Sequence, residues 1–161
     1  MASKTVAVHA SIAAAVDIVF RHIVPIDLTT IFTGYGPLPA VVDTQDQSGG
    51  WDAPGQTRTV HLSDGSTAKE HLIAYDRPNS FEYIVSDFSG SLGHLAKEAR
   101  GHWGFSQHGE EAPTIVVWKY TFYARSRIAY PVLWFIATFL WRGYMQKALH
   151  IAQQQLEANV T

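Results

Sequence analysis

Alternating apolar and polar positions divide the chain into strands, two short helices and one long helix. Residues 4–10 alternate and predict an opening strand. Residues 11–24 follow with apolar side chains at helical spacing, with Ser11 as the expected N-cap and a proline directly after the segment. A second short helix is expected from Asp27, its N-cap, to Phe32, where turn-forming residues begin.

The middle of the chain carries six short segments with strand patterns, separated by Gly, Pro, Asp, Asn or Ser. No helical pattern lies between them, so they predict an antiparallel meander rather than βαβ units. The last third predicts one long helix that begins around Pro131, a residue suited to a first helical turn. The expected strands are residues 40–46, 56–62, 67–75, 80–88, 95–106 and 114–124.

This order of elements predicts an α+β fold in which a curved antiparallel sheet wraps around the long C-terminal helix. That arrangement buries one face of a single sheet. With 161 residues, the chain suits a single domain over residues 1–161.

The segment "GQTRTVHLSDGSTAKEHL" (residues 55–72) predicts a hairpin whose loop length decides which side chains face inward. A two-residue Asp-Gly loop sets Arg58 opposite His71, whereas a three-residue loop over residues 63–65 sets Arg58 opposite Glu70. Only the three-residue loop puts the apolar positions of both strands on one face. We therefore expect Arg58 and Glu70 to be neighbours on the inner face.

Two charges on an inner face need each other or trapped water, because an unpaired buried charge costs several kcal/mol. The Arg58–Glu70 pair can be a buried salt bridge that fixes the sheet. It can equally be the polar anchor of a cavity that is otherwise apolar, the usual composition of a ligand pocket. Both interpretations stay open.

The motifs "GxxRxVxLxDG", "ExL" and a late "TxVxWxYxF" resemble the START/Bet v1-like superfamily (SRPBCC, polyketide cyclase/dehydrase-like), and the resemblance covers nearly the whole chain. It implies a helix-grip fold with two short helices after the first strand and a deep cavity between sheet and C-terminal helix. Members bind lipids, hormones or polyketides, and only some are enzymes. In the abscisic-acid receptors of this superfamily, the positions that match Val60, Leu62 and Glu70 line the cavity.

The chain also departs from those receptors, because their cavity lysine and gate loop have no match here. The segment "VPIDLTTIFTGYGPLPAV" (residues 24–41) resembles an uncharacterised bacterial branch. Hormone signalling is therefore not expected.

Aromatic residues at strand spacing supply further candidates. Tyr83 and Val85 share one face of their strand, and the face of residues 114–124 that is expected to point inward is rich in aromatics. Such residues are either plain core or cavity wall, and the Tyr120 hydroxyl can orient a ligand. The candidate ligand-binding residues are Arg58, Val60, Leu62, Glu70, Tyr83, Val85, Trp118, Tyr120 and Phe122.

The facing of residues 95–106 is ambiguous. Glu98, Arg100 and His102 share one parity, and two aromatic residues share the other. Apolar content favours the aromatic face inward, whereas alignment with the superfamily favours the polar face, and a bulge at one of the glycines can reconcile the two. If His102 points inward, it joins Glu70 as a candidate catalytic group for proton transfer.

Composition excludes several classes of function. A net charge of −2 argues against a nucleic-acid partner, and the absence of cysteine removes disulfides and thiolate chemistry. The eight histidines form no metal-binding motif, so neither a metal nor a cofactor is expected. The N-terminal apolar run is too interrupted for a signal peptide, and a cytoplasmic location is expected.

Residues 128–141 are apolar on every side and flanked by arginines. The run is shorter than the roughly 20 residues that span a bilayer. A gripped helix does not need apolar residues on all faces, so the surplus indicates a cavity lid, a homodimer contact or peripheral membrane docking. Core packing combined with a homodimer surface is our first interpretation.

Three functional hypotheses follow. The first is a protein that binds a small hydrophobic or aromatic ligand, with Arg58 and Glu70 as its polar anchor. The second is a cofactor-independent polyketide cyclase, dehydratase or lyase that uses Glu70 or His102. The third is a lipid carrier that loads at membranes through its C-terminal helix.

Overall fold

The computed structural model of the protein describes residues 2–160. One antiparallel sheet is formed by β1 (Ser3–Ile12), β2 (Val41–Gln45), β3 (Thr57–Leu62), β4 (Thr67–Asp76), β5 (Ser80–Ser86), β6 (Ala96–Gln107) and β7 (Thr114–Ala124). The helical elements are α1 (Val16–Ile23), α2 (Leu28–Ile31), the 3₁₀ turn η1 (Ser91–His94), α3 (Tyr130–Phe135), the π-helical segment η2 (Ile136–Trp141) and α4 (Arg142–Val160).

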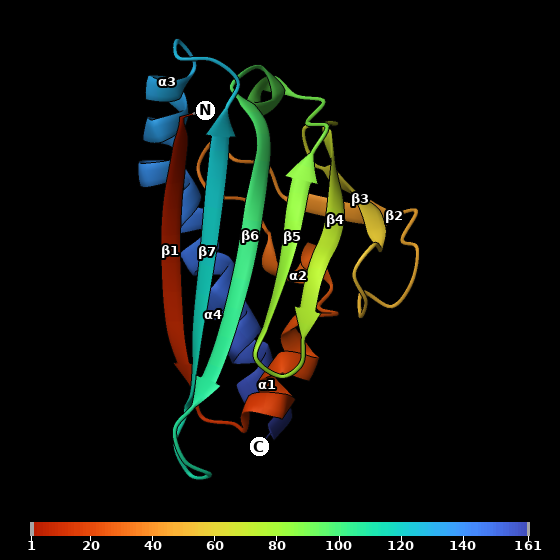
Figure 1. The fold of residues 1–161 in the computed structure, drawn as a ribbon, viewed down its shortest axis with the longest axis vertical. Helices are drawn as coiled ribbons and strands as arrows, with labels where there is room; N and C mark the ends of the chain where they lie inside the picture. The colour runs from red at the N-terminus through yellow and green to blue at the C-terminus, as the bar shows by residue number, and fades with distance from the viewer. Residues whose placement is uncertain (1, 161) are drawn as a thin grey trace.

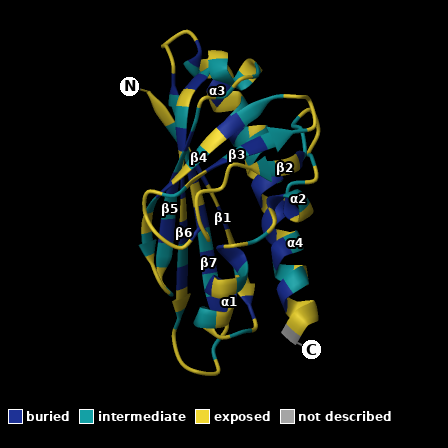
Figure 2. Ribbon diagram, turned by 90° about the vertical axis from the view of Figure 1, so that its right-hand side faces the viewer, coloured by how far each residue is buried: buried dark blue, intermediate teal, exposed yellow. Residues whose placement is uncertain are grey.

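The strands lie in the order β1-β7-β6-β5-β4-β3-β2. Figure 1 shows the sheet in front of the C-terminal helix, with α1 near the lower ends of the strands and α2 behind the sheet. Figure 2 shows the same sheet and α4 as two layers seen from the side. The predicted α+β helix-grip fold is therefore confirmed, including the two short helices after the first strand.

The first strand is longer than the sequence pattern predicted, and Ser11 is not a helix cap. Ser11 pairs with Ile115 in the β1–β7 ladder, and Ile12 next to it is fully buried. The helix α1 instead begins at Val16, whose N–H donates to the side-chain carbonyl of Gln107 over 3.1 Å. Long-range pairing with β7 thus outweighs the local capping preference of serine.

The start of α2 follows the prediction. The Asp27 carboxylate accepts hydrogen bonds from the backbone N–H of Thr29 at 3.0 Å and from its hydroxyl at 2.7 Å. The helix ends after one turn, and the chain then bends at Gly34 and Gly36, which both have positive φ. This bend brings residues 35–40 over the inner side of the sheet.

The β3–β4 hairpin has the predicted three-residue loop. Arg58 is paired with Glu70 and Val60 with Ala68, and Gly65 adopts the left-handed conformation at φ +87°. The apolar positions of both strands consequently share the inner face. The burial pattern predicts this register, whereas the turn sequence does not, since Asp-Gly alone also fits a two-residue loop.

The C-terminal helix is continuous but not uniform. It begins at Tyr130, with Pro131 in its first turn, as predicted. Between α3 and α4, the six residues of η2 are π-helical, a widening that the sequence pattern did not predict. No helix of the described residues is long and apolar enough to span a bilayer.

Candidate ligand-binding cavity

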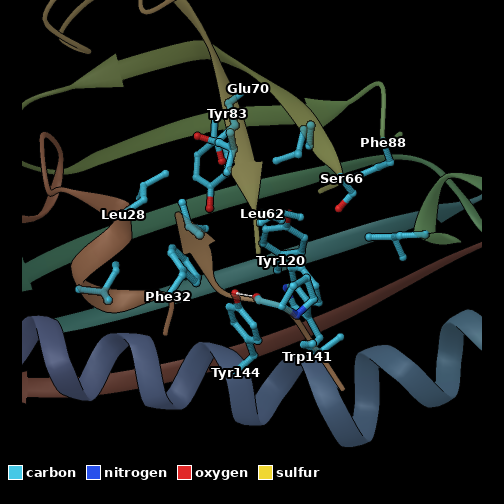
Figure 3. Close-up of a pocket in the computed structure, with 18 of the residues that line it drawn as sticks. Leu28, Phe32, Leu62, Ser66, Glu70, Tyr83, Phe88, Tyr120, Trp141 and Tyr144 are labelled. Atoms are coloured by element: carbon cyan, nitrogen blue, oxygen red, sulfur yellow. Dashed lines mark hydrogen bonds between the residues drawn. The ribbon is translucent and has the colours of Figure 1, made fainter. Parts of the chain in front are cut away.

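A cavity of about 410 Å³ lies between the inner face of the sheet, α2, the loop that follows it and the C-terminal helix (Figure 3). Its walls are mostly apolar and aromatic. The sheet contributes Trp103 and Trp118, whose rings stack with centroids 4.3 Å apart. Across from the sheet lie Trp141 and Tyr144 of the C-terminal helix. Such a hollow is not a packing defect of one residue, because the sheet, α2, the loop after it and the C-terminal helix all contribute to its walls.

One wall of the cavity carries an ion pair. Arg58 Nε lies 2.8 Å from Glu70 Oε1, and the two side chains are 8% and 13% exposed. The guanidinium also stacks on the ring of Trp51, with its carbon 4.0 Å from the ring centroid. These two contacts of Arg58 use its Nε and one face of the guanidinium. Both side chains of the pair also line the cavity.

Trp51 was not predicted. It lies in the loop between β2 and β3, is 1% exposed and has a positive φ of +58°, a strained conformation for a bulky residue. Its ring contacts the Arg58 guanidinium and lines the cavity, although it comes from a loop that is largely polar. The available signal was a single tryptophan in an otherwise polar loop, which indicates a side chain that folds back onto the protein.

Two tyrosine hydroxyls complete the polar group of this wall. Trp118 Nε1 donates to the Tyr83 hydroxyl oxygen over 3.2 Å, and the ring centroids of Tyr83 and Tyr120 are 6.5 Å apart. Burial raises the pKa of both phenols, and the negative charge of Glu70 raises each pKa further. Both are therefore neutral hydrogen-bond donors at neutral pH.

These raised pKa values predict a loss of stability in alkaline solution. Burial also raises the pKa of Tyr144, so three phenols titrate above their unfolded value of about 10. The unfolded chain then binds fewer protons above about pH 10, and the free energy of unfolding falls by up to about 1.4 kcal/mol per pH unit for each phenol. Urea unfolding between about pH 8 and about pH 11 measures this slope.

The Tyr120→Phe variant provides the control for that experiment. It removes one of the three phenols, so the alkaline slope should fall by about one third. A slope that is the same for the variant and the parent would contradict the assignment of Tyr120 to this effect.

A glycine makes room for the Tyr83 ring. Gly101 of β6 pairs with Tyr83 on one side and with Tyr120 on the other. A Cβ atom at Gly101 would overlap Cζ and the hydroxyl of Tyr83. The absence of a side chain at this position thus sets where the Tyr83 hydroxyl lies.

A loop on the far side of the cavity is attached to α4. Tyr144 donates its hydroxyl hydrogen to the Pro39 carbonyl, and Lys147 Nζ donates to the Gly34 carbonyl over 2.8 Å. The ring of Tyr35 covers Gly143, where a Cβ atom would overlap it. These contacts hold residues 34–39 as one wall of the cavity.

Most of the predicted ligand-binding residues line the cavity, and one does not. Phe122 is fully buried, but it packs in the core against Trp141, with ring centroids 5.1 Å apart. Phe32, Phe88, Leu92, Ile136 and Leu140 line the cavity but were not singled out from the sequence. Those that line it as predicted are Arg58, Val60, Leu62, Glu70, Tyr83, Val85, Trp118 and Tyr120.

His102 does not reach the cavity. It is exposed on the outer face of β6, paired in register with Glu82 and Lys119. The inward facing on which its catalytic candidacy depended is therefore wrong, and Glu70 is the one catalytic candidate that lies in the cavity.

The other polar residues of β6 also point outward. Arg100 contacts Glu98 at 3.4 Å on the outer face, while Trp103 and Phe105 point inward. The irregularity in the β6 register lies between Ala96 and Glu98, before the glycines that were expected to carry a bulge. The alternation of apolar residues therefore predicted the inward face of β6 correctly. The alignment with the superfamily, which favoured the polar face inward, was wrong.

Within residues 2–160, the structure has no group of three or more His, Asp or Glu side chains that could hold a metal ion. The charged residues that line the cavity are Arg58 and Glu70, which are in direct contact, and Asp64, whose carboxylate accepts hydrogen bonds from the backbone N–H and hydroxyl of Ser66. The chemistry of this wall is thus an ion pair with phenolic hydrogen-bond donors nearby.

The chain matches the family model described as "Polyketide cyclase / dehydrase and lipid transport" over residues 3–157. The comparison with curated proteins found no match.

Solved structures share the fold at low sequence identity. A norcoclaurine synthase point mutant of Thalictrum flavum in complex with a transition-state analogue has a TM-score of 0.72 at 11% identity, covering 99% of this chain and 98% of its own. The protein XoxI of Bacillus cereus has a TM-score of 0.65 at 17% identity, covering 100% and 99%. Major latex-like protein 151 of Panax ginseng has a TM-score of 0.61 at 14% identity, covering 95% and 97%.

At these identities the solved structures show the fold alone, and the family model supplies the membership. The chain belongs to the polyketide cyclase/dehydrase and lipid transport family, within the SRPBCC (START/Bet v1-like) superfamily.

Proposed function

We propose that the protein binds a small, largely apolar ligand in its internal cavity, with a polar group of the ligand held at Arg58, Glu70, Tyr83 and Tyr120. The observation that carries this proposal is a cavity of about 410 Å³ whose mostly apolar walls include the buried Arg58–Glu70 ion pair. Ligand pockets typically span about 300–1,000 Å³ and combine apolar walls with a few convergent polar groups.

The unused hydrogen-bonding capacity of this wall defines the ligand's polar group. The Tyr120 hydroxyl makes no hydrogen bond to another side chain within residues 2–160, and the Arg58–Glu70 contact occupies one nitrogen and one oxygen. A neutral phenol donates to a carbonyl or carboxylate oxygen, and the free guanidinium nitrogens favour the same acceptors. The expected ligand therefore has an aromatic or aliphatic body and a carbonyl or carboxylate group.

Native mass spectrometry of the purified protein tests for a co-purified ligand without a guess at its identity. A titration with 1-anilinonaphthalene-8-sulfonate, an aromatic anion, provides a second readout. The proposal expects saturable binding with enhanced fluorescence in the natively folded protein. Absence of both a retained molecule and saturable probe binding would overturn it.

Two neighbouring positions on β5 offer a matched pair of variants. Val85 lines the cavity, whereas Ile84 is on the opposite face of the strand. Val85→Trp should fill the cavity and weaken probe binding at least about tenfold, while Ile84→Trp should leave it within about twofold, because side chains alternate across a strand. Equal effects of the two variants would show that the probe binds elsewhere.

The Glu70→Gln variant tests the polar anchor. It keeps the shape of the side chain but removes its charge, so both ligand affinity and the free energy of unfolding should change. The anchor role fails if affinity and stability both stay at the parent values.

A second candidate is proton transfer on the bound ligand, in a cyclase-, dehydratase- or lyase-type reaction. It is favoured by one observation, the placement of the Glu70 carboxylate beside two neutral phenol donors. The carboxylate would take a proton from the ligand, and the phenols would stabilise the resulting oxyanion. Deuterium uptake from solvent into the co-purified ligand, lost in Glu70→Gln, would support this reaction.

A further inference from the structure

An exposed apolar surface lies on the outer side of α3 and η2 and on the turn that precedes α3. It consists of Ile128, Val132, Phe135 and Phe139, which are 90%, 51%, 54% and 57% exposed, with Trp134 at its side at 39%. We call these five residues the aromatic patch. The Phe139 ring lies 5.1 Å from that of Phe135 and 5.9 Å from that of Trp134, so the patch is continuous.

The fold does not require these residues to be apolar. The inner side of the same helix already packs against the sheet through Leu133, which is fully buried, and Ile136 and Leu140 line the cavity. The patch therefore adds apolar area beyond what packing of this helix needs. A continuous exposed apolar surface of this kind marks an interaction site.

Positive charge surrounds the patch. The sequence from residue 112 to residue 156 contains five Lys and Arg and no Asp or Glu, although the whole chain has a net charge of −2. Arg127 and Arg142 are exposed at the two ends of the patch, and Lys4 Nζ lies 5.4 Å from the centroid of the Trp134 ring. Acidic residues are thus kept away from this helix in the sequence.

This charge distribution favours one kind of partner. In a symmetric homodimer the same patch would meet itself, which would bring the basic rims of both copies together and produce repulsion. An anionic bilayer instead offers an apolar interior for the aromatic side chains and negative headgroups for Lys and Arg. Tryptophan is also the residue type enriched at membrane interfaces.

We propose that the aromatic patch docks the protein on anionic lipid bilayers, with Phe135 and Phe139 inserted below the headgroups and Arg127, Arg142 and Lys4 at the headgroup level. This surface faces away from the cavity, so docking does not depend on the proposed ligand or on any catalysis. It does place the helical wall of the cavity directly against the bilayer.

Cosedimentation with large unilamellar vesicles tests the proposal. Vesicles of phosphatidylcholine alone are compared with vesicles that contain about 30% phosphatidylserine, at about 0.05 M and about 0.5 M NaCl. The protein should bind the phosphatidylserine vesicles at low salt and lose at least about tenfold in affinity at high salt or without phosphatidylserine. Failure to bind the anionic vesicles at low salt would overturn the proposal.

Variants of exposed residues identify the surface. Phe135→Ser combined with Phe139→Ser should abolish binding, and Arg127→Gln combined with Arg142→Gln should weaken it by about tenfold or more, since each basic residue near such a membrane contributes about 1 kcal/mol. Val42→Ser is the matched control, because Val42 is 55% exposed on β2, outside the patch. Equal loss in the control would show that general surface hydrophobicity, and not the patch, drives binding.

Light scattering coupled to size-exclusion chromatography distinguishes the alternative occupant. A monomer in solution agrees with the proposal. A dimer that Phe135→Ser and Phe139→Ser convert to a monomer would assign the patch to a second copy of the chain and overturn membrane docking. Thermal unfolding of each variant checks that the substitutions leave the fold unchanged.

Discussion

Replacing Arg58 by methionine is expected to lower the free energy of unfolding by about 3 kcal/mol. The substitution keeps an unbranched apolar stem but leaves the Glu70 carboxylate, which is 13% exposed, without its cation. It also removes the stacking of the guanidinium on Trp51. This expected loss lies at the lower end of the range for breaking a buried ion pair, because the cavity can admit water to the carboxylate. Urea unfolding measures the change.

Two comparisons make this result specific. The Arg58→Met/Glu70→Leu double variant removes both charges and should regain most of the lost stability, while ligand binding stays impaired. The Arg100→Met variant breaks an ion pair on the outer face, where Arg100 is 44% exposed, and should cost less than about 1 kcal/mol. Similar losses in Arg58→Met and Arg100→Met would mean that burial of the Arg58–Glu70 pair has no energetic consequence.

The Gly101→Ala variant is expected to destabilise the protein by about 2 kcal/mol and to weaken ligand binding at least about tenfold. Its methyl group would occupy the space of the Tyr83 hydroxyl. The Tyr83 ring packs beside Phe81, so it would have to move toward the cavity and lose its hydrogen bond from Trp118. Urea unfolding and probe titration measure the two effects separately.

Gly104→Ala is the matched control on the same strand. A Cβ atom there would lie 3.8 Å from its nearest neighbour, a carbon of the His102 ring, which is an ordinary contact. Its stability should therefore stay within about 1 kcal/mol of the parent. In a Tyr83→Leu background, Gly101→Ala should lose most of its effect, because the ring that it displaces is gone. A full effect in that background would contradict the steric explanation.

The parts of this molecule that the sequence predicts best are those governed by strand parity. Arg58 and Glu70 were placed together on the inner face because a one-residue slip would have put polar side chains in the core. Trp118 and Tyr120 followed from the same alternation along a single strand. Periodicity works here because the inner face of each of these strands is more deeply buried than its outer face.

Strand parity does not predict the positions of side chains that reach the site from irregular segments. Trp51 lies in a loop without periodicity, and its burial results from contact with an arginine that is close only after folding. Tyr144 and Pro39 are separated by about a hundred positions in the sequence, and their hydrogen bond joins a helix to a loop. Such contacts depend on the packing of whole elements, which local pattern does not describe.

The π-helical segment η2 has a consequence for how this helix can vary. A π-helical widening corresponds to one residue inserted into an α-helix, and each α-helical residue turns the helix by about 100°. Deleting Thr138, whose buried hydroxyl has no hydrogen-bond partner within the described residues, would restore regular winding and rotate α3 by about that angle relative to α4. Leu133 would then leave the core and Val132 would turn toward the sheet, while Phe139, which follows the deletion, would keep its place and the patch would be divided. Inserting or deleting a residue at this point of the helix therefore changes which side of α3 is exposed on the protein surface.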